Sequence, residues 1–255
     1  MTIGAMNNPI KDAKEEVERI AKGGFDFVDF TYELPATPHS ADSIKEIIRN
    51  YGISVIGHTN PTLPMVYPLP SVRSACISEL KKSILFLRDI GAKKINIHPF
   101  YYNAHLNPDD VTEQNILVLK EMAHFCKEND LQLMLENFRF PFSSTRSFIR
   151  IMKEVPNLKI HLDIAHFNLE ANFETEIEKF LNVFRSEIEH CHIHDNNGKL
   201  DEHLPLGCGN INWMKVVQLL KNSGYDKTFT LEVFAKDPAY LLYSKKRWQE
   251  LWDCA

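Results

Sequence analysis

Residues 132–163, QLMLENFRFPFSSTRSFIRIMKEVPNLKIHLD, contain one complete strand, helix and strand. The apolar run Leu133–Leu135 is typical of a strand that is buried on both faces, as the strands of parallel sheets are. The amphipathic stretch Ser144–Lys153 then predicts a helix, and a second β-rich run follows at Lys159–Asp163. A strand, a helix and a second strand in this order form the unit from which parallel sheets are built.

The same alternation continues along the whole chain. Eight β-rich runs are expected as strands: Thr2–Met6, Phe25–Phe30, Ile53–His58, Lys94–His98, Gln132–Glu136, Lys159–Asp163, Glu189–His194 and Thr228–Val233. Eight amphipathic stretches are expected as helices: Lys11–Lys22, Ser43–Asn50, Ser74–Ile90, Thr112–Glu128, Ser144–Lys153, Glu174–Phe184, Trp213–Lys221 and Ala239–Trp252. Eight such units in 255 residues, without a linker between them, predict an α/β fold, a single-domain (β/α)₈ TIM barrel over residues 1–255. A Rossmann-like open sheet is the alternative, but no G-x-G-x-x-G segment follows the first strand.

The ends of several expected helices carry capping residues. Ser40 precedes a helical stretch and is predicted to cap its N-terminus. Glycines that adopt a left-handed backbone are expected just past four helix ends, at Gly23, Gly52, Gly91 and Gly224.

The composition is that of an ordinary soluble protein, with 44% apolar and 25% charged residues. The formal net charge of −5 provides no global positive field for nucleic acid, although a local basic groove stays open. The five cysteines are widely spread without a C-x-x-C pair, which indicates reduced thiols and no disulfide framework. We therefore expect a cytoplasmic protein without a membrane partner, and the oligomeric state is left open.

Histidine, aspartate and glutamate residues follow six successive predicted strands. They are His58, His98, Glu136, Asp163 with His166, His192 with Asp201 and His203, and Glu232. A single histidine after a strand is usually structural, and His39, His105 and His124 are interpreted in that way. Because the C-terminal ends of barrel strands converge on one face, the set as a whole predicts a shared metal site.

The residue types indicate the kind of metal. Imidazole and carboxylate ligands without thiolate favour zinc, manganese, cobalt or iron over magnesium or calcium. We expect zinc or manganese, with one to three ions per chain. Strand alternation points Cys191 away from His192 and into the core, whereas His190 and His194 share the side of His192 and could bind the metal or support its ligands. Cys208 lies in a Gly-Cys-Gly turn and is assigned a loop role.

The order and spacing of these segments resemble the xylose isomerase-like TIM-barrel superfamily. This superfamily includes sugar (phosphate) isomerases and epimerases and the endonuclease IV-type abasic-site nucleases. The segments that carry the resemblance are His58, His98-Pro99, Leu135-Glu136-Asn137, Asp163-x-x-His166, His192-Ile193-His194-Asp195-Asn196, Asp201-Glu202-His203-Leu204-Pro205-Leu206-Gly207-x-Gly209 and Leu231-Glu232.

The isomerase and epimerase branch implies one divalent cation. By resemblance, its four ligands would be Glu136, Asp163, His192 and Glu232, and substrate would be held by His166, His58, His98 and Lys199. The cation would chelate adjacent oxygens of a small carbohydrate-like substrate. Glu136 and Glu232 would then move the proton at the carbon next to the polarised carbonyl.

The endonuclease IV branch implies three zinc ions and DNA as the partner. By resemblance, one ion would be held by His58, His98 and Glu136, a second by Glu136, Asp163, His192 and Glu232, and a third by His166, Asp201 and His203. However, residues 59–65 contain no aromatic side chain with which to probe a duplex, and no loop rich in lysine or arginine accompanies them.

We therefore expect a metal-dependent isomerase or epimerase of a sugar or polyol, with phosphorylated substrates included. The alternative is a zinc phosphodiesterase of the abasic-site endonuclease type. A third interpretation is a ligand-binding protein with a structural ion, which is less favoured because the ligands exceed one closed coordination shell.

Two features near the predicted site have open interpretations. Six aromatic residues could line a pocket or cap the barrel core: Phe100, Tyr101, Tyr102, Phe138, Phe140 and Phe167. The proline-rich segment Pro61–Pro70 could be a lid over the site or a stiff loop.

Overall fold

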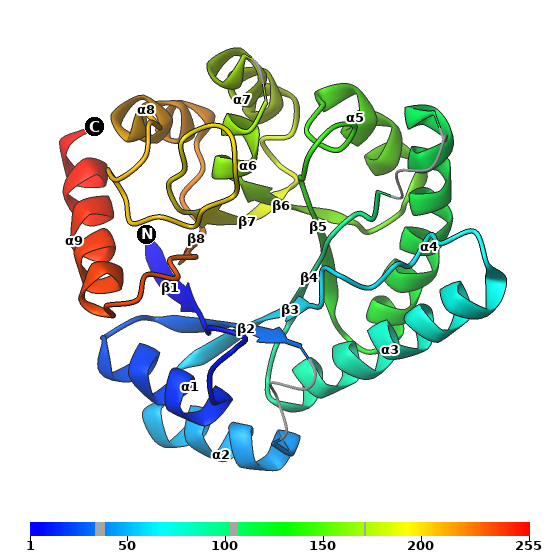
Figure 1. The fold of residues 1–255 in the computed structure, drawn as a ribbon, viewed down its shortest axis with the longest axis horizontal. Helices are drawn as coiled ribbons and strands as arrows, with labels where there is room; N and C mark the ends of the chain where they lie inside the picture. Colours follow the sequence, from blue (N-terminus) through cyan, green and yellow to red (C-terminus); the bar gives the residue numbers. More distant parts are fainter. Residues whose placement is uncertain (34–38, 102–106, 171) are drawn as a thin grey trace.

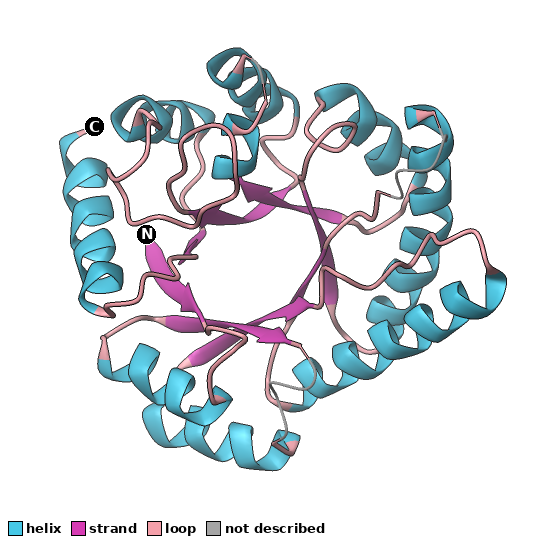
Figure 2. Cartoon of the chain, in the orientation of Figure 1, coloured by secondary structure: helices cyan, strands magenta, loops and turns pink. Residues whose placement is uncertain are grey.

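The computed structural model describes residues 1–33, 39–101, 107–170 and 172–255. In this part of the chain, parallel strands close into a barrel in sequence order, and helices surround it (Figures 1 and 2). The strands are β1 (Thr2–Met6), β2 (Phe27–Tyr32), β3 (Ser54–Thr59), β4 (Lys94–Ile97), β5 (Gln132–Glu136), β6 (Lys159–Asp163), β7 (Ile188–Ile193) and β8 (Thr228–Leu231). The predicted (β/α)₈ barrel is confirmed.

The helices on the outside differ from prediction mainly at their ends. They are α1 (Ala13–Lys22), α2 (Ala41–Tyr51), α3 (Pro70–Asp89), α4 (Pro108–Glu128), α5 (Thr145–Glu154), α6 (Ile164–Asn168), α7 (Phe173–Val183), α8 (Trp213–Ser223) and α9 (Ala239–Cys254). Both α3 and α4 begin about a turn earlier than expected, at Pro70 and Pro108, because proline suits the first turn of a helix. The short helix α6 was not predicted.

The predicted caps hold except at one glycine. The Ser40 side chain accepts a hydrogen bond from the Ser43 amide and caps α2. Left-handed φ angles occur after three helices, at Gly52 (64°), Gly91 (113°) and Gly224 (77°). The expectation for Gly23 is wrong, because its φ is −73° and the left-handed turn is made one residue later, at Gly24.

The barrel interior has an apolar floor below a polar layer. Phe27, Ile56 and Met134 form a separate cluster of buried apolar side chains inside the barrel. The Phe27 ring lies so close to β1 that a Cβ atom on Gly4 would overlap it, so glycine is required there. Side chains two residues apart in a strand point to the same face. Above Phe27, Ile56 and Met134, the next side chains on this face are therefore Asp29, His58 and Glu136.

The larger apolar core lies between the strands and the surrounding helices. It includes Leu80, Phe148, Val216 and Trp248, and Cys191 is fully buried there as predicted. All five cysteines are free thiols. Among the described residues, none of the helices is both long and apolar enough to cross a membrane.

Candidate active site

A cavity of about 370 Å³ opens at the C-terminal ends of the strands. Its lining is dominated by polar residues that follow different strands. The residues that line it are Met6, Pro9, Thr31, Glu33, His58, Pro61, Thr62, His98, Glu136, Phe138, His166, Asp201, His203, Glu232 and Phe234. The barrel therefore gathers residues from most of the chain at one site.

One group of side chains surrounds a ring nitrogen of His192. Its Nδ1 atom lies 2.9 Å from Glu232 Oε2 and 3.8 Å from both Glu136 Oε1 and Asp163 Oδ2. This nitrogen is buried and has no hydrogen-bond partner. Three carboxylate oxygens around one buried imidazole nitrogen are a donor set that fits a divalent cation such as zinc or manganese.

The other oxygen of Glu136 faces a second group. Glu136 Oε2 lies 3.3 Å from His98 Nε2 and 3.9 Å from His58 Nε2. His58 Nε2 and His98 Nδ1 are 3.3 Å apart. Asn96 donates a short hydrogen bond to the same oxygen, which holds the Glu136 carboxylate between the two groups. Glu136 therefore connects the His192 group to the pair of histidines.

A third group lies nearer the mouth of the cavity. His166 Nε2 is 3.1 Å from Asp201 Oδ2, and His203 Nε2 is 3.8 Å from the same oxygen. The ring of His194 stacks on that of His203, with centroids 4.4 Å apart. His203 has a left-handed φ of 49°, which is uncommon for a residue other than glycine and is often found at functional sites.

Local hydrogen bonds set the positions of Asp163 and His166. Asn137 pairs with the backbone of Asp163 through two bonds of 2.8 Å, which joins the end of β5 to the end of β6. The Asp163 carboxylate then accepts a bond of 2.8 Å from the His166 amide and caps α6. This unpredicted helix is the reason that the Asp163-x-x-His166 spacing turns both side chains to the site.

The buried charges compensate one another. Burial would raise the pKa values of Glu136 and Glu232, but neighbouring histidines lower them below their usual range. Burial would lower the pKa of His166 and His203, yet nearby carboxylates raise it to about 10 for His166 and about 9 for His203. Burial instead lowers the pKa of His58 to about 4, so this ring is neutral.

Without a metal, the site therefore holds protons on histidines that would otherwise bind a cation. The pKa of His192 is also raised well above its usual range, because the charges of Glu232 and Glu136 outweigh the effect of burial. A divalent cation entering the His192 group must therefore displace a proton.

The nine residues predicted as metal ligands come together. Seven line the cavity, and Asp163 and His192 are fully buried beside them. Lys199, predicted to contact substrate, is exposed in the loop after β7 and does not line the cavity. Of the three histidines interpreted as structural, His39 pairs with Asp12 and His124 with Glu128 on the surface, and His105 lies outside the described residues.

The aromatic residues divide between several environments. Phe138 lines the cavity, and its ring meets that of His166 edge to face at 5.0 Å. Phe167 belongs to the buried core, whereas Phe100 is only partly buried against it. Tyr101 and Phe140 are exposed, and Tyr102 lies outside the described residues.

The proline-rich segment Pro61–Pro70 is attached to the barrel. Met65 and Val66 are buried in the main apolar core. Pro61 and Thr62, at the start of the segment, line the cavity. These contacts favour the interpretation of a stiff loop over that of a free lid.

Sequence reasoning missed the polar face of β2. Asp29, Thr31 and Glu33 alternate along this strand and just beyond it, with Thr31 and Glu33 lining the cavity. Asp29 is fully buried below them. This face could have been identified in the sequence, because polar residues stand at every second position of a strand that was expected to be buried on both faces.

Asp29 is ionised despite its burial. Burial would raise the pKa of its carboxyl group, but hydrogen bonds from His190 and His192 lower it well below the usual range. Glu33 shows the opposite effect, because partial burial raises its pKa.

The sequence matches a family model described as xylose isomerase-like TIM barrel over residues 17–252. An uncharacterized protein of Methanocaldococcus jannaschii is 28% identical over 229 residues, which cover 85% of this chain and 77% of the relative. D-psicose 3-epimerase of Ruminiclostridium cellulolyticum is 23% identical over 259 residues, which cover 94% of this chain and 84% of that enzyme.

Solved structures share the fold over the whole chain. A D-tagatose 3-epimerase-like protein superimposes with a TM-score of 0.88 at 26% identity, covering 100% of this chain and 98% of the other. The IOLI protein, whose crystal structure has a bound zinc atom, superimposes with a TM-score of 0.82 at 18% identity, covering 100% and 99%.

Proposed function

The chain belongs to the xylose isomerase-like TIM-barrel family, and we propose that it is a divalent-metal-dependent isomerase or epimerase that acts on a sugar or polyol. One observation carries this proposal. The buried Nδ1 atom of His192 has no hydrogen-bond partner and lies within 3.8 Å of oxygens of Glu136, Asp163 and Glu232. A divalent cation could contact this nitrogen and all three carboxylates at once, which a single proton cannot do.

Zinc or manganese suits this donor set of one imidazole and three carboxylates. The zinc atom of the IOLI protein, which shares the fold, supports the same assignment. A bound dication would polarise a substrate carbonyl and stabilise the negative charge that develops when the neighbouring carbon loses a proton.

Glu136 and Glu232 are proposed to move that proton. Both carboxylates are ionised and reach the same buried nitrogen from different strands, so one can remove a proton and the other can return one. The atom to which the proton returns would distinguish isomerisation from epimerisation. The protonated His166, held by Asp201 at 3.1 Å, is placed to donate a hydrogen bond to a substrate oxygen.

A neutral polyhydroxy substrate is proposed on the charges of the cavity walls. Asp201 and Glu232 pair with His166 at 3.1 Å and His203 at 3.2 Å, so repulsion of a phosphate group would come mainly from the carboxylate of Glu33. Hydroxyl groups can donate to the same oxygens. The D-psicose 3-epimerase relative, whose name describes a ketose enzyme, supports a ketose as the substrate class.

A second candidate function is a zinc phosphodiesterase of the abasic-site endonuclease type. The observation that favours it is that several overlapping groups in the described residues could hold a metal, among them one formed by His58, His98 and Glu136 and one by His194, Asp201 and His203. Three ions in this arrangement could stabilise both the attacking and the leaving oxygen of a phosphodiester.

Solvent exchange distinguishes the two functions. The protein, loaded with zinc or manganese, is incubated in D₂O with a panel of neutral ketoses and followed by proton NMR. We expect deuterium to enter a cognate ketose at the carbon next to the carbonyl, and the Glu136→Gln variant to show no exchange. Nicking of an abasic-site duplex without exchange on any ketose would instead establish the phosphodiesterase.

A further inference from the structure

We propose that Asp29 is the positioning residue of this metal centre: its carboxylate orients the His192 ring and keeps the ring proton on Nε2, so that Nδ1 can bind the cation. The inference rests on the proposed function, because His192 is a metal ligand only under that proposal. Asp29 lies in β2, far from His192 in sequence, and belongs to none of the motifs that predicted the site.

The contacts of Asp29 connect three strands inside the barrel. Its Oδ2 atom accepts a hydrogen bond of 2.9 Å from Thr230 Oγ1 and lies 2.9 Å from His192 Nε2. His190 Nε2 lies 3.2 Å from the same oxygen. All four side chains are fully buried. Asp29 is thus held in place from β7 and β8 and has little freedom to turn away.

The acceptor at Asp29 determines the tautomer of His192. Thr230 Oγ1, His190 Nε2 and His192 Nε2 all converge on Asp29 Oδ2, which is the arrangement of an accepting carboxylate oxygen, so the short contact places the ring proton of His192 on Nε2. A neutral imidazole then has its lone pair on Nδ1, the atom that faces the carboxylates of Glu136, Asp163 and Glu232. Metal-binding histidines commonly donate their other ring N–H to a carboxylate, which fixes the ring and strengthens it as a ligand.

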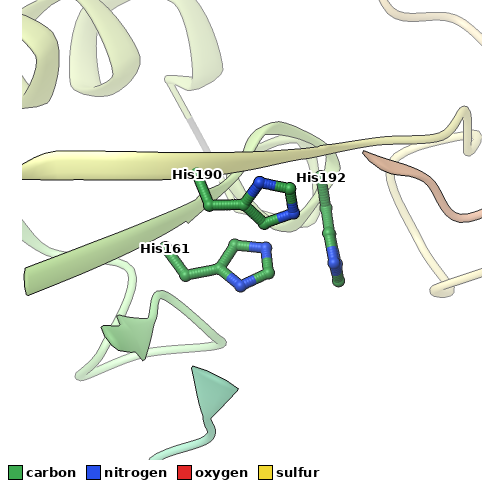
Figure 3. A group of neighbouring side chains, drawn as sticks. All are labelled: His161, His190 and His192. Atoms are coloured by element: carbon green, nitrogen blue, oxygen red, sulfur yellow. The ribbon is translucent and has the colours of Figure 1, made fainter. Parts of the chain in front are cut away.

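His161 and His190 lie beside His192, but neither of them fixes the position of its ring proton (Figure 3). His190 Nε2 lies 3.2 Å from Asp29 Oδ2 and 2.9 Å from Thr230 Oγ1, and its Nδ1 lies 2.7 Å from Thr228 Oγ1. The ring of His161 meets that of His192 edge to face, with centroids 3.9 Å apart, yet neither of its nitrogens has a hydrogen-bond partner. His161 therefore contacts the same ring without fixing its proton.

This difference provides a matched control for the experiment. Asp29→Asn removes the charge with almost no change in shape, and Asp29→Ala removes the acceptor. His161→Leu removes a ring that packs on His192 and lies 3.7 Å from Glu136 Oε2 without a hydrogen bond to either residue. Each metal-free protein is titrated with Co²⁺ in competition with a chromophoric chelator, and the visible absorption of the bound Co²⁺ is recorded. Circular dichroism checks the fold of each variant.

We expect both Asp29 variants to bind Co²⁺ about 10–100-fold more weakly than wild type with a changed absorption spectrum, because loss of such a carboxylate has that effect on metal affinity. His161→Leu should keep the wild-type affinity and spectrum. A folded Asp29 variant that binds Co²⁺ with the wild-type affinity and spectrum would overturn the role of Asp29 and leave the proposed function intact. If the wild-type protein itself bound no Co²⁺, the proposed function would fail and the inference with it.

Discussion

Glu232 Oε2, just after β8, forms an ion pair of 2.9 Å with the Nδ1 atom of His192 in β7, but the contact does not have the geometry of a hydrogen bond. The carboxylates of Glu136 and Asp163 approach the same atom from two further strands. A cluster of buried negative charges around a nitrogen is unfavourable unless a proton or a cation occupies its centre.

Glu136→Gln should abolish exchange and turnover, with a loss of at least about 10³-fold, because a proton-transfer group and a metal ligand are both removed. The fold should persist, since a glutamine oxygen can still accept the hydrogen bond from Asn96. Turnover and bound metal are measured together. Glu121→Gln, at an exposed ion pair with Lys81, is the control and should behave as wild type. Full activity in Glu136→Gln would exclude its assigned role.

The metal-free protein should lose stability as the pH rises above neutrality. The folded protein holds protons on His203 and His166 with pKa values of about 9 and about 10, against 6.5 in the unfolded chain. Their contribution to the free energy of unfolding is therefore complete below pH 6.5 and is lost as the pH rises through 9 and 10.

The measurement for this pH effect is the thermal midpoint of the metal-free protein between pH 6.5 and pH 10. Saturating zinc should flatten the dependence, because the ion takes the place of the protons. His203→Gln should flatten it partly in the metal-free protein. A midpoint that rises with pH over this range would contradict the assigned charges.

Gly4→Ala should destabilise the barrel by about 1–3 kcal/mol, the usual effect of an extra methyl group in a packed core. The added Cβ would overlap the Phe27 ring. Denaturant unfolding of the single variants and of Gly4→Ala combined with Phe27→Leu forms a double-mutant cycle. The smaller leucine should recover part of the loss, and additive effects would show that the overlap is not the cause.

Glu33→Gln should make the cavity more tolerant of phosphorylated ketoses. The Glu33 carboxylate lines the cavity, and removing its charge removes a repulsion. We expect the ratio of kcat/KM for a phosphorylated ketose to that for the neutral ketose to rise by about tenfold, the change that corresponds to about 1.4 kcal/mol. An unchanged ratio would place the phosphate outside the reach of Glu33. Glu170→Gln, which lies outside the cavity lining, serves as the control.

Much of the fold could be read from local patterns. The alternation of β-rich and amphipathic stretches gave the strands and the helices, because burial on both faces and helical amphipathicity are properties of neighbouring residues. Helix ends were less well predicted: the left-handed residue after α1 is Gly24 and not Gly23, since either glycine satisfies the local pattern.

The sequence by itself also determined that the nine predicted metal ligands meet at one site, because parallel strands of a closed barrel must present their C-terminal ends on one face, but it did not identify Thr31 and Glu33 of the cavity lining. Only the tertiary structure decided how those residues are grouped: that one oxygen of Glu136 faces His192 and the other His98, and that Asp29 lies behind His192. These relations depend on strand register and side-chain rotamers across elements far apart in the chain. No local sequence pattern encodes them.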